Sequence, residues 1–283
     1  MPYTPLPQPP LPHTPHTPLG RLRWAAADGW TLTLRALAHR VKRPEQLAMN
    51  LLFPVMVVLM MGYLFGGQME VPGTDYRAFL IPGMFAMTMV FGVESTFTAI
   101  AVDAARGVSD RFRSMPMAPS AVVVGRGAAD LAESLLALAV MAVCGVLIGW
   151  RVHDGIAAAL AGLGLLLLLR FALVWAGVYL GLVAKGPESV TMIQILVWPV
   201  GFLSSALAAP STMPGWLGAI AEWNPMSATV TACRDLFGDP SLAALSGDSW
   251  AARHSVLLAV AWPLAITAVF FPLAVRRYRA LGR

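Results

Sequence analysis

Three ionisable side chains lie deep inside long apolar stretches of this sequence: Glu94, Glu133 and Arg170. A charge at the centre of a bilayer costs about 2.5–3.5 kcal/mol on the mildest insertion scale, so each needs a partner or water. Counted along their helices from the predicted outer ends, the three fall close to one depth. We expect either that Arg170 pairs with a carboxylate and joins helices, or that a remaining carboxylate faces a pathway and attracts a cationic amphiphile. Asp130 lies nearer the end of its stretch, and we expect it to be hydrated.

The composition is that of a membrane protein. Hydrophobic residues make up 57% of the 283 residues and charged residues only 12%, whereas soluble domains are about 25% charged. Each of six apolar stretches is long enough to cross about 30 Å of hydrocarbon as a helix, which satisfies its own backbone. They lie near 46–66, 79–102, 120–149, 155–184, 189–209 and 253–274. We therefore predict an all-α polytopic membrane protein whose six transmembrane helices occupy residues 45–275.

The basic residues predict the orientation of these helices. They concentrate before the first stretch, in the connection 103–119, near residue 185 and in the segment 276–283. The alternate connections carry fewer, so the positive-inside rule places both termini in the cytoplasm of a multi-pass plasma-membrane protein. The net charge of +5 suits anionic lipid and not nucleic acid, because the basic residues lie between apolar stretches and form no continuous face.

The N-terminal region divides into two parts. Residues 1–20 are rich in proline and carry no charged side chain, which predicts a disordered cytoplasmic tail. Residues 21–44 mix basic residues with apolar residues at helical spacing, which predicts an amphipathic helix in the cytoplasmic headgroup plane. We expect its membrane contacts to involve Trp30, Leu34, Leu37, Arg40 and Arg43.

The last outer connection, 210–252, is the longest and is rich in tryptophan and proline. Apolar residues outside a span predict short re-entrant helices that dip into the outer leaflet, where only burial by protein can satisfy their ends. The residues expected to shape this segment are Pro214, Trp216, Trp223, Asn224 and Pro225.

The sequence contains no G-x-x-x-x-G-K-[ST] loop for nucleotide phosphates. Cys144 and Cys233 have no neighbouring cysteine or metal ligand at useful spacing, so we expect neither a disulfide nor a metal site. We therefore predict no catalytic residue and no cofactor in this chain, and energy from ATP must arrive through a partner.

Two segments carry a resemblance to a known family. Residues 103–130 read DAARGVSDRFRSMPMAPSAVVVGRGAAD, and residues 213–238 read MPGWLGAIAEWNPMSATVTACRDLFG. Supporting segments read FPVMVVLMMGYLFGG and YRAFLIPGM. In this order and spacing they resemble the membrane subunits of type-2 ABC exporters, in particular the actinobacterial daunorubicin/doxorubicin-resistance permeases.

The resemblance implies two permease subunits, most simply a homodimer, assembled with two cytoplasmic P-loop ATPase subunits that bind ATP and Mg. The amphipathic helix and the loop between the second and third spans would contact the ATPase. The matching loop positions are Asp103, Gly107, Asp110, Arg111, Phe112, Arg113, Ser114 and Pro116. Family members often carry an acidic residue before the glycine, where this chain has Arg106. The alternative is a basic loop that touches only lipid headgroups.

The function that follows is the permease half of an exporter for hydrophobic or amphipathic molecules, drug or lipid. The main alternative is a proton-driven secondary transporter that uses Glu94 or Glu133, although we find no inverted repeat to support it. An intramembrane lipid enzyme would need converging acids or histidines, and the sequence places its histidines near different membrane boundaries. A non-transporting scaffold for an ATPase is a further alternative.

Overall fold

The computed structural model describes residues 29–31, 33–34, 38, 44–65, 76–105, 119–184, 187–238 and 249–280, and their regular structure is helical. The long helices are α2 (Pro44–Met60), continued by the π-helix η1 (Met61–Phe65), α3 (Tyr76–Ala105), α5 (Pro119–Ile148), α6 (Gly155–Val183), α7 (Pro187–Phe202) and α11 (Ser255–Ala280). The short ones are η2 (Pro210–Thr212), α8 (Gly215–Trp223), α9 (Pro225–Phe237) and α10 (Trp250–Arg253).

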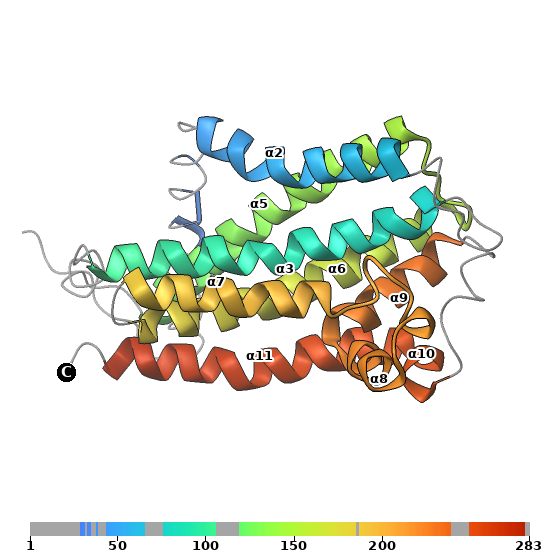
Figure 1. Ribbon diagram of the computed structural model, residues 1–283. Helices are drawn as coiled ribbons and strands as arrows, with labels where there is room; N and C mark the ends of the chain where they lie inside the picture. The colour runs from blue at the N-terminus through green and yellow to red at the C-terminus, as the bar shows by residue number, and fades with distance from the viewer. Residues whose placement is uncertain are drawn as a thin grey trace, which may run out of the picture.

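The long helices run roughly side by side and alternate in direction, while α8, α9 and α10 gather at one end (Figure 1). At the opposite end lie the last turn of α3, the first turn of α5, the end of α6, the start of α7 and the end of α11 (Figure 1). The helix ends next to the basic connections of the sequence therefore lie at a single end of the bundle. That this end faces the cytoplasm stays a prediction.

Helices occur at all six predicted positions, and four of them are long and apolar enough within the described residues to cross a membrane: α3, α5, α6 and α11. The apolar stretches of the other two, Pro54–Tyr63 and Ser189–Phe202, are shorter, so the count of six spans stays a prediction. Helix α7 ends at Phe202 and not near residue 209, because the chain turns there to meet α9. The Ser205 amide donates to Ser227 Oγ at 2.9 Å in this turn.

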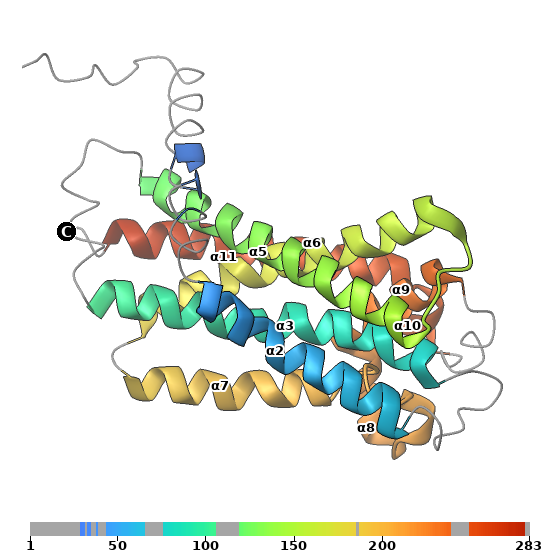
Figure 2. The ribbon, with the colours of Figure 1, turned by 90° about the horizontal axis from the view of Figure 1, so that it is seen from above.

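Helix α6 lies at the centre of the fold, where it packs against α3, α5, α9 and α11. The view in Figure 2 shows α7 at the edge of the bundle, beside α3. The G-x-x-x-G pair of α6 faces α3: a Cβ at Gly181 would lie 2.7 Å from Ile100 Cβ, and one at Gly177 would lie 3.3 Å from the Val93 carbonyl. Small residues thus let the two helices approach closely.

We expect Gly181→Leu to lower the stability of the purified protein by about 1–3 kcal/mol, because the added side chain would overpack this contact. Gly164 is the matched control on the same helix, since a Cβ there meets nothing within 4 Å. Thermal unfolding in detergent should show a lower midpoint for Gly181→Leu and none of this loss for Gly164→Leu. Equal midpoints for the two variants would contradict the close packing of α3 on α6.

Candidate functional site

Of the residues predicted to contact the ATPase, the structure describes only the first, Asp103. Asp103 lies in the last turns of α3, while Gly107, Asp110, Arg111, Phe112, Arg113, Ser114 and Pro116 lie outside the described residues. The predicted interfacial helix is described in part: residues 29–31, 33–34 and 38 are helical, and Leu37, Arg40 and Arg43 lie outside.

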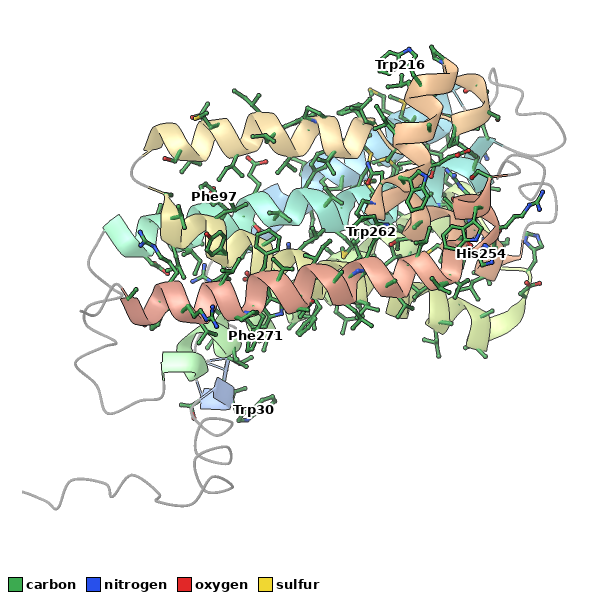
Figure 3. All side chains as sticks on the ribbon, turned by 90° about the horizontal axis from the view of Figure 1, so that it is seen from below. Trp30, Phe97, Trp216, His254, Trp262 and Phe271 are labelled. Carbon is green, nitrogen blue, oxygen red and sulfur yellow. The ribbon has the colours of Figure 1, made fainter. Side chains whose placement is uncertain are left out.

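The described part of the interfacial helix has one protein-facing side. Trp30 is 64% exposed and Leu34 is 49% exposed, as an apolar membrane-facing side would be. Thr33 is buried, and its hydroxyl proton is shared between the Gly29 carbonyl of its own helix at 2.7 Å and the Gly125 carbonyl of α5 at 3.1 Å. Trp30 lies toward the end of the bundle where α11 finishes, away from Trp216 and His254 (Figure 3). This segment is therefore fixed to the start of α5, one residue before Arg126.

The three predicted intramembrane charges belong to three neighbouring helices. Glu94 on α3 and Glu133 on α5 are half-buried, and Arg170 on α6 is buried. The Arg170 guanidinium donates from Nε to Ser134 Oγ and from Nη2 to Thr96 Oγ1, both at 2.8 Å. It lies against Gly92, where a Cβ would be 2.9 Å from its Cζ. Arg170 thus joins α3, α5 and α6 through two hydroxyls. Its pairing with Glu94 or Glu133 stays a prediction.

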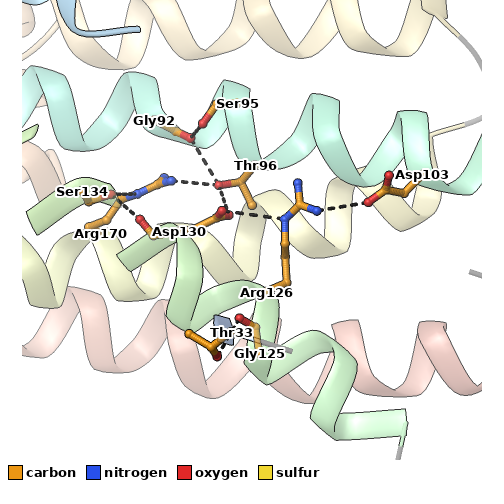
Figure 4. A network of polar contacts seen from close by, with 10 residues as sticks. All are labelled: Thr33, Gly92, Ser95, Thr96, Asp103, Gly125, Arg126, Asp130, Ser134 and Arg170. Atoms are coloured by element: carbon orange, nitrogen blue, oxygen red, sulfur yellow. Dashed lines mark hydrogen bonds and ion pairs between the residues drawn. The ribbon is translucent and has the colours of Figure 1, made fainter. Parts of the chain in front are cut away.

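Asp130 is the centre of this group of polar contacts, which contradicts the expectation that it is hydrated. It is 2% exposed, and its Oδ2 accepts from Thr96 Oγ1 at 2.8 Å, the same hydroxyl that accepts from Arg170 (Figure 4). Ser134, one turn further along α5, donates to the Asp130 carbonyl at 2.8 Å. Asp130 is buried because α3 and α6 cover this side of α5, which counting along a single helix does not reveal.

Arg126 connects Asp130 to the end of α3. Its Nη1 donates to Asp103 Oδ2 at 3.1 Å, and its Nε lies 3.8 Å from Asp130 Oδ1 (Figure 4). Arg126 and Asp103 lie on the two helices between which residues 106–118 fall in the sequence, so this ion pair joins those two helices. We call the chain of contacts through Asp103, Arg126, Asp130, Thr96, Arg170 and Ser134 the polar network. It runs from the end of α3 into the buried centre of the bundle.

The predicted re-entrant residues lie on or next to α8 and α9, at the other end of the bundle. We call α8, α9 and α10 together the outer segment. Pro214 is the N-cap of α8, Asn224 caps α9, and Pro225 is the first residue of α9. Trp216 and Trp223 are more than half exposed. The outer segment therefore has the predicted short helices; that they enter the outer leaflet stays a prediction.

Helix α9 is the buried part of the outer segment. It packs between α3, α6 and α11, and Phe237 at its end makes edge-to-face contacts with Phe85 and Trp150. Arg234, a basic residue of the connection 210–252, is only 5% exposed. Burial raises the pKa of the neighbouring Asp235 carboxyl, while a hydrogen bond from Ser255 at 3.0 Å and the nearby Arg234 act in the opposite direction.

Two features of the described residues bear on whether they hold a metal or a ligand. No set of three His, Cys, Asp or Glu side chains converges among them as a metal site requires. Between α8, α9 and α10 lies a pocket of about 10 Å³, lined by residues that include Glu222, Ser227 and Thr231. It has room for about one water molecule and not for a drug or a lipid.

Comparisons with known proteins agree with the resemblance. Residues 28–237 match the ABC-2 type transporter family. The chain is 33% identical over 258 residues to the daunorubicin resistance ABC transporter permease protein DrrB1 of Streptomyces coeruleorubidus, covering 90% of this chain and 88% of that protein. It is 28% identical over 187 residues to the doxorubicin resistance ABC transporter permease protein DrrB of Mycobacterium tuberculosis, covering 65% and 64%. It is 26% identical over 226 residues to the probable permease DrrC of the same organism, covering 76% and 79%.

Proposed function

Because this chain belongs to the ABC-2 type transporter family, we propose that it is the permease subunit of an ATP-driven exporter. The observation that carries the proposal is the similarity over 90% of the chain to a permease whose name refers to daunorubicin resistance. The cargo would be a hydrophobic or amphipathic molecule, drug or lipid, moved outward across the plasma membrane. The chain would act as one of two permease subunits, a homodimer, with its termini in the cytoplasm.

Two P-loop ATPase subunits would supply the energy, since this sequence has no phosphate-binding loop of its own. They would bind ATP and Mg and contact the interfacial helix together with the loop from Asp103 to Pro116. The sequence Asp110-Arg111-Phe112-Arg113 suits such a contact, because it places charges on both sides of an aromatic anchor.

The polar network would carry motion from the ATPase to the membrane. Arg126 joins α5 to α3 through Asp103, and it follows Gly125, to which the interfacial helix is hydrogen-bonded. Both expected ATPase contacts thus converge on the start of α5. From there Asp130 and Thr96 lead to Arg170 on α6. A displacement of the loop would in this way reach the bundle centre through direct contacts.

The carboxylates Glu94 and Glu133 have two roles open to them. One of the two carboxylates would pair with Arg170. The remaining carboxylate would face the pathway and attract a cationic amphiphile as it crosses the membrane. The outer segment, dipping into the outer leaflet, would close the pathway on the release side.

The decisive experiment is a pull-down of the tagged chain from its native membrane in mild detergent, followed by an ATPase assay. We expect a stoichiometric P-loop ATPase to copurify, and we expect the double variant Asp110→Arg/Arg111→Asp to lose it, because reversed charges would repel the ATPase surface. Arg151→Asp is the control, since Arg151 is exposed just beyond the far end of α5.

Copurification that survives the charge reversal would contradict the coupling role of the loop. A chain that purifies alone and shows no ATPase activity would contradict the exporter. In that case a proton-driven carrier becomes the leading function, with Glu94 and Glu133 as the residues to replace next.

A further inference from the structure

Helix α7 has little support from the rest of the bundle. Its main helical contact is with α3, where Trp198 packs on Phe91 with ring centroids 5.1 Å apart. Its opposite side is open: Met192, Ile195 and Leu196 are each about two-thirds exposed. A helix that packs on the protein along one side only needs further contacts, for example at its end, to keep it in one position.

The amide side chain of Asn224 provides one such point at the outer end of α7. Its Nδ2 donates to the carbonyls of Val200 and Leu203, each at 2.8 Å. Its Oδ1 accepts from the Met226 amide at 2.9 Å and so caps α9. One residue therefore begins α9 and holds the last turn of α7.

Arg234, on the buried side of α9, provides the second point. Its Nε and Nη2 donate to the Phe79 carbonyl of α3 at 3.2 and 2.8 Å, and Nη2 also donates to the Ala206 carbonyl beyond α7 at 3.3 Å. The guanidinium lies 3.7 Å from the centroid of the Phe79 ring, a cation–π contact. Only the planar fork of arginine makes these contacts together, because an ammonium is a single point charge.

The carbonyl of Ala206 is itself pressed against α3. A Cβ at Gly83 would overlap this carbonyl, so glycine is what permits the approach. Phe79, which accepts from Arg234, lies one turn earlier on α3, three residues before Pro82. The donor that Pro82 lacks would have served the Ala78 carbonyl and not that of Phe79, so Arg234 uses the second lone pair of the Phe79 carbonyl.

We infer that Asn224 and Arg234 are positioning residues through which the outer segment fixes α7 against α3. The role of this arrangement in transport rests on the proposed exporter function. The position of α7 itself does not, and it can be measured without an ATPase partner.

Hydrogen exchange of the full chain in lipid nanodiscs tests the positioning. We expect Arg234→Lys and Asn224→Asp each to speed exchange in α7 at least about threefold, while α6 and α9 keep their protection. Asn224→Asp keeps the oxygen that caps α9 and removes the two donations to α7. Arg151→Lys is the control, because Arg151 donates only to the Val146 and Trp150 carbonyls next to it.

The inference would be overturned if exchange in α7 were unchanged. It would also be overturned if faster exchange were confined to α9 or spread over the whole bundle, because Arg234 would then stabilise α9 or the fold in general and not the position of α7. If Arg234→Lys does not fold, Asn224→Asp decides the question alone. In the complex with its ATPase, we expect both variants to lower dye transport at least about threefold relative to the Arg151→Lys control. Unchanged transport would overturn the role in transport, and absence of any ATPase partner would overturn the exporter but not the positioning.

Discussion

Replacing Asp130 with asparagine is expected to lower the stability of the protein by about 3–5 kcal/mol, because the change removes one partner from a buried ionic group. Asp130 is 2% exposed and lies between Arg126 and the hydroxyl that binds Arg170. Asparagine has nearly the same shape, so the loss would come from charge and not from a cavity. Thermal unfolding in detergent would show it as a lower midpoint.

The control for this change is Glu45→Gln, which also neutralises a carboxylate but at an exposed position on α2. We expect it to shift stability by no more than about 0.5 kcal/mol. The double variant Asp130→Asn/Arg170→Met should lose less stability than the two single variants lose in sum. In the double variant both charges are removed, so neither is left buried without the other. Stability losses that add fully would show that Asp130 and Arg170 are not energetically coupled through Thr96.

Replacing Arg126 with glutamine is expected to lower cargo transport by about tenfold or more while the basal ATPase rate of the assembled complex is retained. A typical coupling free energy of about 1–3 kcal/mol corresponds to an effect of this size. The variant should also lower stability, because it takes the Arg126 guanidinium away from the buried Asp130 carboxylate, 3.8 Å from its Nε; the pair with the partly exposed Asp103 contributes little to stability. Transport and ATP hydrolysis measured on the same proteoliposomes separate the two outcomes.

Arg151→Gln is again the matched control, because it removes an arginine whose hydrogen bonds stay at the end of its own helix. Asp103→Asn should reproduce part of the Arg126→Gln effect, since it breaks the same contact from the other side. If Arg126→Gln lowered ATP hydrolysis and transport in equal proportion, the network would be supporting ATPase binding and not transmission.

The approximate positions of the long helices could be predicted because each of them coincides with an apolar stretch of the sequence. The predicted stretch 155–184 and the helix Gly155–Val183 differ by one residue, and the stretches 79–102 and 120–149 lie close to α3 and α5. The fifth helix was placed too long because residues 203–209 are equally apolar. Their burial comes from contact with α9 and not from crossing the membrane, and hydropathy does not distinguish the two.

The candidate site was only partly predictable, because its contacts join helices that are far apart in sequence. Arg170 was identified from the cost of a charge in an apolar stretch, but its partners Thr96 and Ser134 carry no charge and gave no such signal. Asp130 was expected to be hydrated because it lies near the end of its apolar stretch, but it is buried. A signal was present in the four-residue spacing of Arg126, Asp130 and Ser134, which places all three on one face of a helix.

The junction of three helices at Arg170 also has a consequence for how the protein is made. Thr96 and Arg170 are separated by 74 residues of chain, and Ser134 and Arg170 by 36. At about 5–20 residues per second, a ribosome delivers Asp130 to the membrane several seconds before Arg170 follows. During that interval the nascent chain holds Thr96 and Ser134 before Arg170, which donates to both hydroxyls, has been synthesised. Release of α5 from the translocon into lipid should therefore wait for α6, so nascent chains stopped before Arg170 should remain crosslinkable to the translocon through α5.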